Sequence, residues 1–299
     1  MSVHAGDSVG ERATVPLLAV TMTALAPILW STGGLGFRLV DATPWTMLFW
    51  RSLFMALTLL GASRFVMGRR FLKDFRTVAA NGLSVGIFIA LALIFYVLSI
   101  TATTVADSLL VQAAGPLFIV VFGWILLREE VRVVTVVALL VVGAGIAFIL
   151  VPSLERGGFS GNIMGLLKAL AFAAATVLIR RKRGVQLLPA VSLGAIIATI
   201  VSAVAAPTLS VDTRSLLILA YLGVFQTGIA FALHATFSGR LPSSQTGLLV
   251  LLEAILGPIW VWVFLAEAPA ALTLIGGTMI LSALIAHTLI YARPAARTS

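Results

Sequence analysis

A carboxylate stands in the middle of one of the most apolar stretches of this chain. Glu253 lies in the segment LLVLLEAILGP, with about ten residues on either side before the stretch ends. An ionised group at membrane depth is costly, so if this stretch crosses a membrane its carboxylate is a functional candidate by default. Glu253 could bind the ammonium group of a substrate or exchange a proton. The alternative is a structural carboxyl group bonded to a neighbouring helix.

Two cations are placed in the same way in other apolar stretches. Lys168 lies in GNIMGLLKALAF and Arg51 in MLFWRSLF. Lys168 could bind a substrate carboxylate or pair with Glu253, or its four-carbon stem could carry the ammonium group to the outer headgroups. A buried Arg often serves backbone carbonyls or a carboxylate, so for Arg51 a structural role stands beside substrate contact.

Uncharged polar and aromatic residues accompany these charges inside apolar stretches. They are Gln112, Gln226, Tyr96 and Trp30. A polar side chain that faces lipid without a partner is expensive, so these residues are expected to line the same interior site. Trp30 could instead belong to the belt of aromatic residues at the membrane surface.

The residue patterns of enzymes are missing. The three histidines have no metal-ligand spacing, and there is no GxxxxGK[ST] loop, no Gly-x-Ser-x-Gly elbow and no cysteine. The sequence therefore predicts no catalytic residue, no metal, no cofactor and no hydrolysis of ATP. Any energy that drives the activity of this protein has to come from a gradient of a solute or an ion.

The composition of the chain indicates which structural elements hold these residues in place. Of 299 residues, 60% are hydrophobic and only 10% are charged, whereas soluble domains carry roughly 25% charged residues. Mean hydropathy is +1.12. The apolar residues recur in blocks long enough to cross a hydrocarbon core of about 30 Å. We therefore expect an all-α integral membrane protein with ten transmembrane helices, at 14–36, 44–67, 77–100, 103–127, 132–152, 160–180, 187–207, 215–236, 243–265 and 270–291.

The basic residues set the orientation of these helices. With both termini in the cytoplasm, fifteen Lys and Arg residues of the loops and tails lie inside and three lie outside, as the positive-inside rule requires. The net charge of +9 thus indicates topology and no nucleic-acid partner. The tails 1–13 and 292–299 are expected to be cytoplasmic, and the first apolar block is expected to be retained as a helix. Arg38 and Asp107, near predicted helix ends, are expected at the membrane surface.

Two segments repeat one pattern 138 positions apart. Residues 116–129 read PLFIVVFGWILLRE and residues 254–267 read AILGPIWVWVFLAE, which aligns Trp124 with Trp262 and Glu129 with Glu267. Each half would hold five helices, so the second half enters the membrane with inverted orientation, a common construction of secondary transporters. The alternative is chance similarity between apolar segments. In this register Gly115 aligns with Glu253. The predicted repeats cover 14–152 and 160–291.

Prolines and glycines predict kinks and close contacts in particular helices. Pro27, Pro116 and Pro258 fall inside predicted helices, where each removes a backbone hydrogen bond and can kink the chain. Gly161 and Gly165 have the small-xxx-small spacing that lets two helices approach closely.

The chain resembles the ten-helix branch of the drug/metabolite transporter superfamily, which is built from two EamA-type domains. The resemblance is carried by ALAPILWSTGGLGFR, by Arg51 in FWRSLFMALTLL, by AAGPLFIVVFGWILLREEV with Gly143 and Gly145, by LLEAILGPIWVWVFLAE and by the pair Gly276–Gly277. Family members often have Leu-Glu-Pro where this chain has Leu252, Glu253 and Ala254. A proline break in the ninth helix is therefore not carried over to this chain.

The resemblance implies export of small organic solutes across the bacterial inner membrane, with amino acids as the commonest substrates, and the chain has some likeness to bacterial amino-acid exporters. We expect a secondary exporter of amino acids and related metabolites that works by alternating access as a monomer in the lipid bilayer. Glu253 and Lys168 would hold the opposite charges of a zwitterion, and Gln112, Gln226, Trp30, Tyr96 and Arg51 would complete the site. Two alternatives remain: an exporter of drugs and quaternary cations, and a membrane scaffold without transport.

Overall fold

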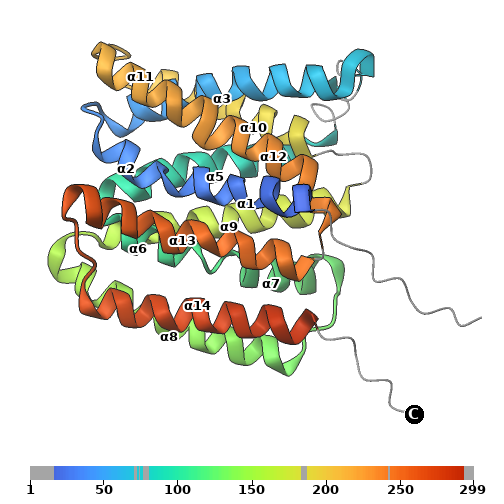
Figure 1. The fold of residues 1–299 in the computed structure, drawn as a ribbon, viewed down its shortest axis with the longest axis vertical. Helices are drawn as coiled ribbons and strands as arrows, with labels where there is room; N and C mark the ends of the chain where they lie inside the picture. The colour runs from blue at the N-terminus through green and yellow to red at the C-terminus, as the bar shows by residue number, and fades with distance from the viewer. Residues whose placement is uncertain are drawn as a thin grey trace, which may run out of the picture.

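The protein is an all-helical bundle. Its computed structural model describes residues 17–70, 73, 75–76, 81–182, 187–241 and 243–292. Ten helical stretches of these residues are long and apolar enough to cross a membrane, which confirms the ten predicted helices. They run roughly parallel in stacked layers (Figure 1). Helices satisfy every backbone polar group internally, as hydrocarbon demands. Of the two predicted tails, only Ala292 lies within the described residues.

The helices divide evenly between the two halves of the chain. The first half holds α1 (Leu17–Ser31), α2 (Gly33–Arg38), α3 (Pro44–Met67), η1 (Gly68–Arg70), α5 (Leu83–Ala102), α6 (Val105–Gln112), α7 (Gly115–Leu127) and α8 (Val133–Arg156). The second half holds α9 (Phe159–Arg181), α10 (Leu187–Ala205), α11 (Thr213–Tyr221), η2 (Leu222–Ile229), α12 (Ala230–Phe237), η3 (Ser238–Arg240), α13 (Ser243–Leu265) and α14 (Ala271–Ala292). We call the end of the bundle that holds the turn 128–132 the inner end, and the opposite end the outer end.

Three of the predicted membrane helices are not continuous α-helices. The first breaks at Thr32 between α1 and α2, and the fourth breaks between α6 and α7, just before Pro116. The eighth contains the π-helical segment η2. Pro27 and Pro258 lie inside helices that continue, so only Pro116 coincides with a break. Helix α13 also runs unbroken through Glu253, where no proline follows.

The duplicated pattern has the same backbone geometry in both copies. Arg128 after α7 and Ala266 after α13, which are 138 positions apart, have φ angles of 57° and 54°. These are the only two non-glycine residues with positive φ in the described part of the chain, and each closes its helix with a left-handed cap. The turn 128–132 and the turn 266–270 lie at opposite ends of the bundle (Figure 1). The two five-helix repeats are thus inverted, as predicted.

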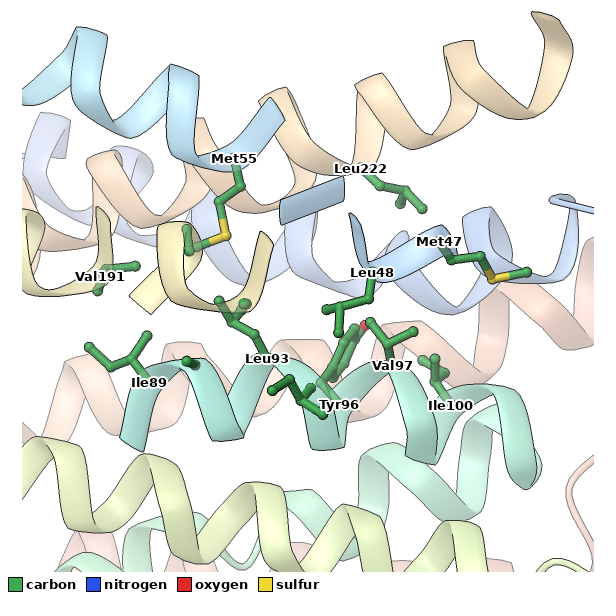
Figure 2. Packing of buried hydrophobic residues seen from close by; sticks show 14 of the residues in the cluster. Met47, Leu48, Met55, Ile89, Leu93, Tyr96, Val97, Ile100, Val191 and Leu222 are labelled. Carbon is green, nitrogen blue, oxygen red and sulfur yellow. The ribbon is translucent and has the colours of Figure 1, made fainter. Parts of the chain in front are cut away.

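Glycines let the two repeats pack closely. A Cβ at Gly161 of α9 would lie 2.7 Å from the backbone of Ala102 in α5, and one at Gly165 would lie 3.0 Å from Ser99 Oγ. The predicted small-residue contact is therefore real. The hydrophobic core beside it joins α3, α5 and α10, where Leu48 and Met55 face Leu93 (Figure 2).

The outermost helix pair, α8 and α14, offers a stability test with an internal control. A Cβ at Gly145 would lie 2.7 Å from the carbonyl oxygen of Gly276, whereas one at Gly143 would meet no atom within 4 Å. We expect Gly145→Ala to lower the free energy of unfolding by about 1–3 kcal/mol, the usual cost of overpacking. Gly143→Ala should raise it slightly, because alanine favours helix. Thermal unfolding in detergent measures both variants, and equal melting temperatures would contradict the prediction.

Candidate functional site

Helix α3 places Arg51 in the interior of the bundle, where it is 2% exposed. The guanidinium carbon lies 5.0 Å from the centre of the Tyr96 ring and 5.6 Å from that of Phe37, within the range of a cation–π attraction. Nη2 donates a hydrogen bond of 3.4 Å to Gln226 Oε1, while Nε and Nη1 have no hydrogen-bond partner among the described residues. Arg51 therefore keeps N–H donors for another acceptor.

Lys168 of α9 points into the bundle beside the same tyrosine. Its Nζ lies 5.8 Å from the Tyr96 ring and 5.8 Å from the Phe172 ring. The ammonium group therefore does not reach outward to the headgroups, which was the alternative considered from the sequence. Figure 2 shows Tyr96 directed from α5 toward α3, and both cations lie within about 6 Å of the centre of its ring.

Glu253 of α13 supplies the negative charge of this group. Lys168 and Arg51 are its charged neighbours. The two ion pairs of the described residues lie at the ends of the bundle and do not include Glu253. Glu253 thus has two cations in its surroundings and forms an ion pair with neither.

Gln226 connects this group to the first helix. It is 1% exposed and lies in η2, and π-helical segments are frequent at functional sites. Its Nε2 donates a 3.0 Å hydrogen bond to the backbone carbonyl of Trp30. Trp30 is 8% exposed, and its ring centre lies 5.0 Å from that of Phe231. Trp30 therefore packs inside the bundle and does not belong to the surface belt.

Gln112 borders the group from α6. Its Nε2 donates to Ser108 Oγ at 2.7 Å, and Ser108 in turn shares a 2.7 Å hydrogen bond with Ser99. Its Oε1 has no partner among the described residues. Gln112 packs near Gly165, which lies one helical turn before Lys168 on α9. The seven predicted residues thus come from both repeats, and together they remain the candidates for one interior site.

Sequence reasoning missed two residues of this region. A Cβ at Gly33 would lie 2.5 Å from the Tyr96 hydroxyl and 2.7 Å from Gln226 Nε2, so only a glycine lets α2 approach these polar groups. The pair Gly33–Gly34 inside an apolar helix could have signalled such a contact. Phe37, which stacks on Arg51, gave no signal because phenylalanine is equally suited to face lipid.

Arg38 and Asp107 lie at helix ends, and both also have partners within the protein. Asp107 is 7% exposed and accepts a 2.6 Å hydrogen bond from Thr273 Oγ1. Arg38 forms an ion pair with Glu267, with N and O 2.8 Å apart. Both residues help to line a pocket of about 300 Å³ near the outer end. None of the seven predicted residues lines that pocket, and the interior group remains our candidate site because its charges converge there.

The chemistry of the interior group is that of binding. It offers two cations, one carboxylate, two amide side chains and aromatic faces to a polar solute. In the described part of the chain no His, Cys, Asp and Glu residues gather in a way that could hold a metal ion. A solute with a carboxylate and an ammonium group would find a partner for each charge.

Known proteins agree with this architecture. The model of the EamA-like transporter family matches residues 17–151 and 159–289. The pseudopaline exporter CntI of two Pseudomonas aeruginosa strains, UCBPP-PA14 and PAO1, is 27% identical over 206 residues, which cover 67% of this chain and 72% of the exporter. A solved crystal structure matches with a TM-score of 0.63 and 20% identity, covering 91% of this chain and 97% of the other. The chain therefore belongs to the EamA-like transporter family, whose model it matches once in each of its two repeats.

Proposed function

We propose that this protein is a secondary transporter that exports amino acids and related small zwitterionic metabolites by alternating access. The observation that carries the proposal is the group of Arg51, Lys168 and Glu253, which brings two cations and one carboxylate together between the repeats. The carboxylate would receive the substrate's ammonium group, and the unpartnered N–H groups of Arg51 would receive its carboxylate together with Lys168. The metabolite exporter among its relatives supports the direction of transport.

The proposed location is the bacterial inner membrane, with the inner end of the bundle and both termini in the cytoplasm. The supporting observation is the excess of Lys and Arg in the loops of that end. Of the competing functions, export of quaternary cations is disfavoured because the site carries one more positive than negative charge. It stays an outcome of the test.

Counterflow in proteoliposomes tests the proposal. Vesicles loaded with one unlabelled amino acid at a time would be diluted into a labelled one, and a parallel series would use cationic dyes. We expect uptake of label with amino acids. Flux of dyes alone would establish the cation exporter, and an absence of flux for every solute would point to a scaffold without transport.

Lys168→Met should distinguish the two kinds of transporter. Without the ammonium group, one partner of a substrate carboxylate is lost, and a charge-assisted hydrogen bond contributes about 1.5–3 kcal/mol. We therefore expect amino-acid flux to fall by about 10- to 100-fold, since each 1.4 kcal/mol is a factor of ten. Export of a quaternary cation would be unchanged or faster. The same loss for both solutes would contradict the assigned role of Lys168.

A further inference from the structure

The two ion pairs of the described residues occupy related places in the two repeats. Glu129 follows the fourth membrane helix of the first repeat and pairs with Arg180, at the end of the first helix of the second repeat. Glu267 follows the fourth helix of the second repeat and pairs with Arg38, at the end of the first helix of the first repeat. Each pair thus joins the two repeats, one at the inner end and the other at the outer end (Figure 1).

The backbone presents the two glutamates in the same way. The N–H of Glu129 bonds to the carbonyl of Gly123, and the N–H of Glu267 bonds to that of Val261, again 138 positions apart. In each copy the glutamate comes directly after a residue in the left-handed backbone conformation, Arg128 or Ala266, which turns the chain back toward the helix. The duplicated turn therefore delivers one carboxylate to each end of the bundle.

The outer pair is the more strongly held. Arg38 also donates hydrogen bonds to the carbonyls of Ile100 at 3.0 Å and Thr103 at 2.7 Å. Glu267 Oε1 accepts from the N–H of Val105 at 2.8 Å, at the start of α6, where the helix dipole favours an anion. The two side chains are 26% and 24% exposed. The outer pair thus joins α2, α5 and α6 to the turn after α13.

The inner pair has fewer hydrogen-bond partners than the outer pair and is more exposed to solvent. Arg180 donates to Glu129 Oε1, and the two side chains are 48% and 42% exposed. Exposed ion pairs contribute little to stability, because water competes for both charges. The inner pair is therefore the easier of the two to open.

The elements that hold these pairs also carry the candidate site. Arg38 follows Phe37, which stacks on Arg51, and α2 begins at Gly33 against Tyr96. Helix α9 carries both Lys168 and Arg180, and α13 carries Glu253 and leads into the turn that holds Glu267. A solute that moves these elements when it binds therefore acts on both pairs.

We propose that the pair Arg38–Glu267, the outer lock, and the pair Arg180–Glu129, the inner lock, hold the two ends of the bundle closed and open alternately during transport. The inference rests on the proposed function and adds the devices that close each face. Both locks are formed in this structure. Opening either face requires its lock to break while the other stays formed.

Accessibility of a single cysteine tests the proposal without any substrate. The chain contains no cysteine, so Ser108→Cys, at a fully buried position beside Gln112, supplies the only thiol. Right-side-out and inverted membrane vesicles would be treated with a membrane-impermeant maleimide. In this background, Glu267→Gln should raise outer relative to inner labelling about tenfold, because charge-assisted hydrogen bonds are lost from one state only. Glu129→Gln should raise inner labelling about two- to threefold, since its pair is exposed.

Matched controls separate opening of a lock from loss of a charge. Glu155→Gln at the outer end and Glu130→Gln beside Glu129 remove the same charge from residues that form no ion pair in the described part of the chain. Neither should change the labelling ratio. An unchanged ratio in both lock variants, or an equal rise of labelling on both faces, would overturn the proposal.

Exchange of charges gives a second, independent result. The double variant Arg180→Glu with Glu129→Arg should restore the normal ratio, because that pair has no other described partner. Arg38→Glu with Glu267→Arg should not, because two carbonyls and one N–H fix the polarity of the outer lock. Transport is measured separately, as flux in counterflow. Normal flux with an unchanged labelling ratio in the lock variants would refute the locks but not the proposed function. A changed labelling ratio without any flux would refute the proposed function but not the locks.

Discussion

Glu253→Gln is expected to lower export by at least about 100-fold. The substitution keeps the shape of the side chain and removes the only negative charge of the interior group, which leaves Lys168 and Arg51 facing each other without compensation. Leaving buried charge without compensation costs about 3–5 kcal/mol. Each 1.4 kcal/mol is about a factor of ten, so flux in counterflow should fall by at least about 100-fold.

The same variant tests whether the carboxylate exchanges protons. Export would be measured with and without a pH gradient in wild-type protein and in Glu253→Gln. If Glu253 couples transport to protons, only the wild type responds to the gradient, and the residual flux of the variant is independent of it. Glu155→Gln serves as the control for a lost charge. Unchanged flux and unchanged pH dependence in Glu253→Gln would show that the carboxylate is structural.

Arg51→Lys is expected to lower export by about 10- to 100-fold although the charge is kept. The planar guanidinium stacks on Tyr96 and Phe37 and at the same time donates to Gln226. An ammonium group is a compact point charge and cannot reproduce that fork. The hydrogen bonds of the guanidinium that lysine cannot make, each worth about 1.5–3 kcal/mol because the donor is charged, account for most of the effect.

A conservative change elsewhere in α3 provides the comparison for Arg51. Arg64→Lys alters an exposed residue near the inner end of the same helix, and we expect its flux and melting temperature to match the wild type. Counterflow and thermal unfolding in detergent measure both variants. If Arg51→Lys transports at the normal rate, the guanidinium geometry has no part in substrate binding.

The register of the repeat shows where the candidate site departs from symmetry. Gly115 of the first repeat aligns with Glu253 of the second. Gly115 begins α7 directly after the break in the fourth helix, whereas Glu253 lies within the unbroken α13. One repeat therefore supplies an interruption of the backbone, and the other supplies a charge at the equivalent place.

The sequence by itself determined the helices and the residues worth testing. Hydrocarbon offers no hydrogen-bond partners, so apolar blocks of membrane length have to be helices, and their number follows from counting. The cost of burying charge singled out Glu253, Lys168 and Arg51 for the same reason. The 138-residue offset also predicted the inversion, because a half with five crossings has to end on the other side.

Only the tertiary structure decided which faces of these helices meet. Lipid and neighbouring helices are equally apolar, so a membrane helix carries little amphipathic pattern to show how it is rotated. The approach of Lys168 and Arg51 to one tyrosine and the interruptions of the first and eighth helices were therefore not visible in the sequence. The same reason hid the partners of Glu129 and Glu267. Their alignment could be read from the chain, but their pairing with Arg180 and Arg38 depends on how the inverted repeats pack.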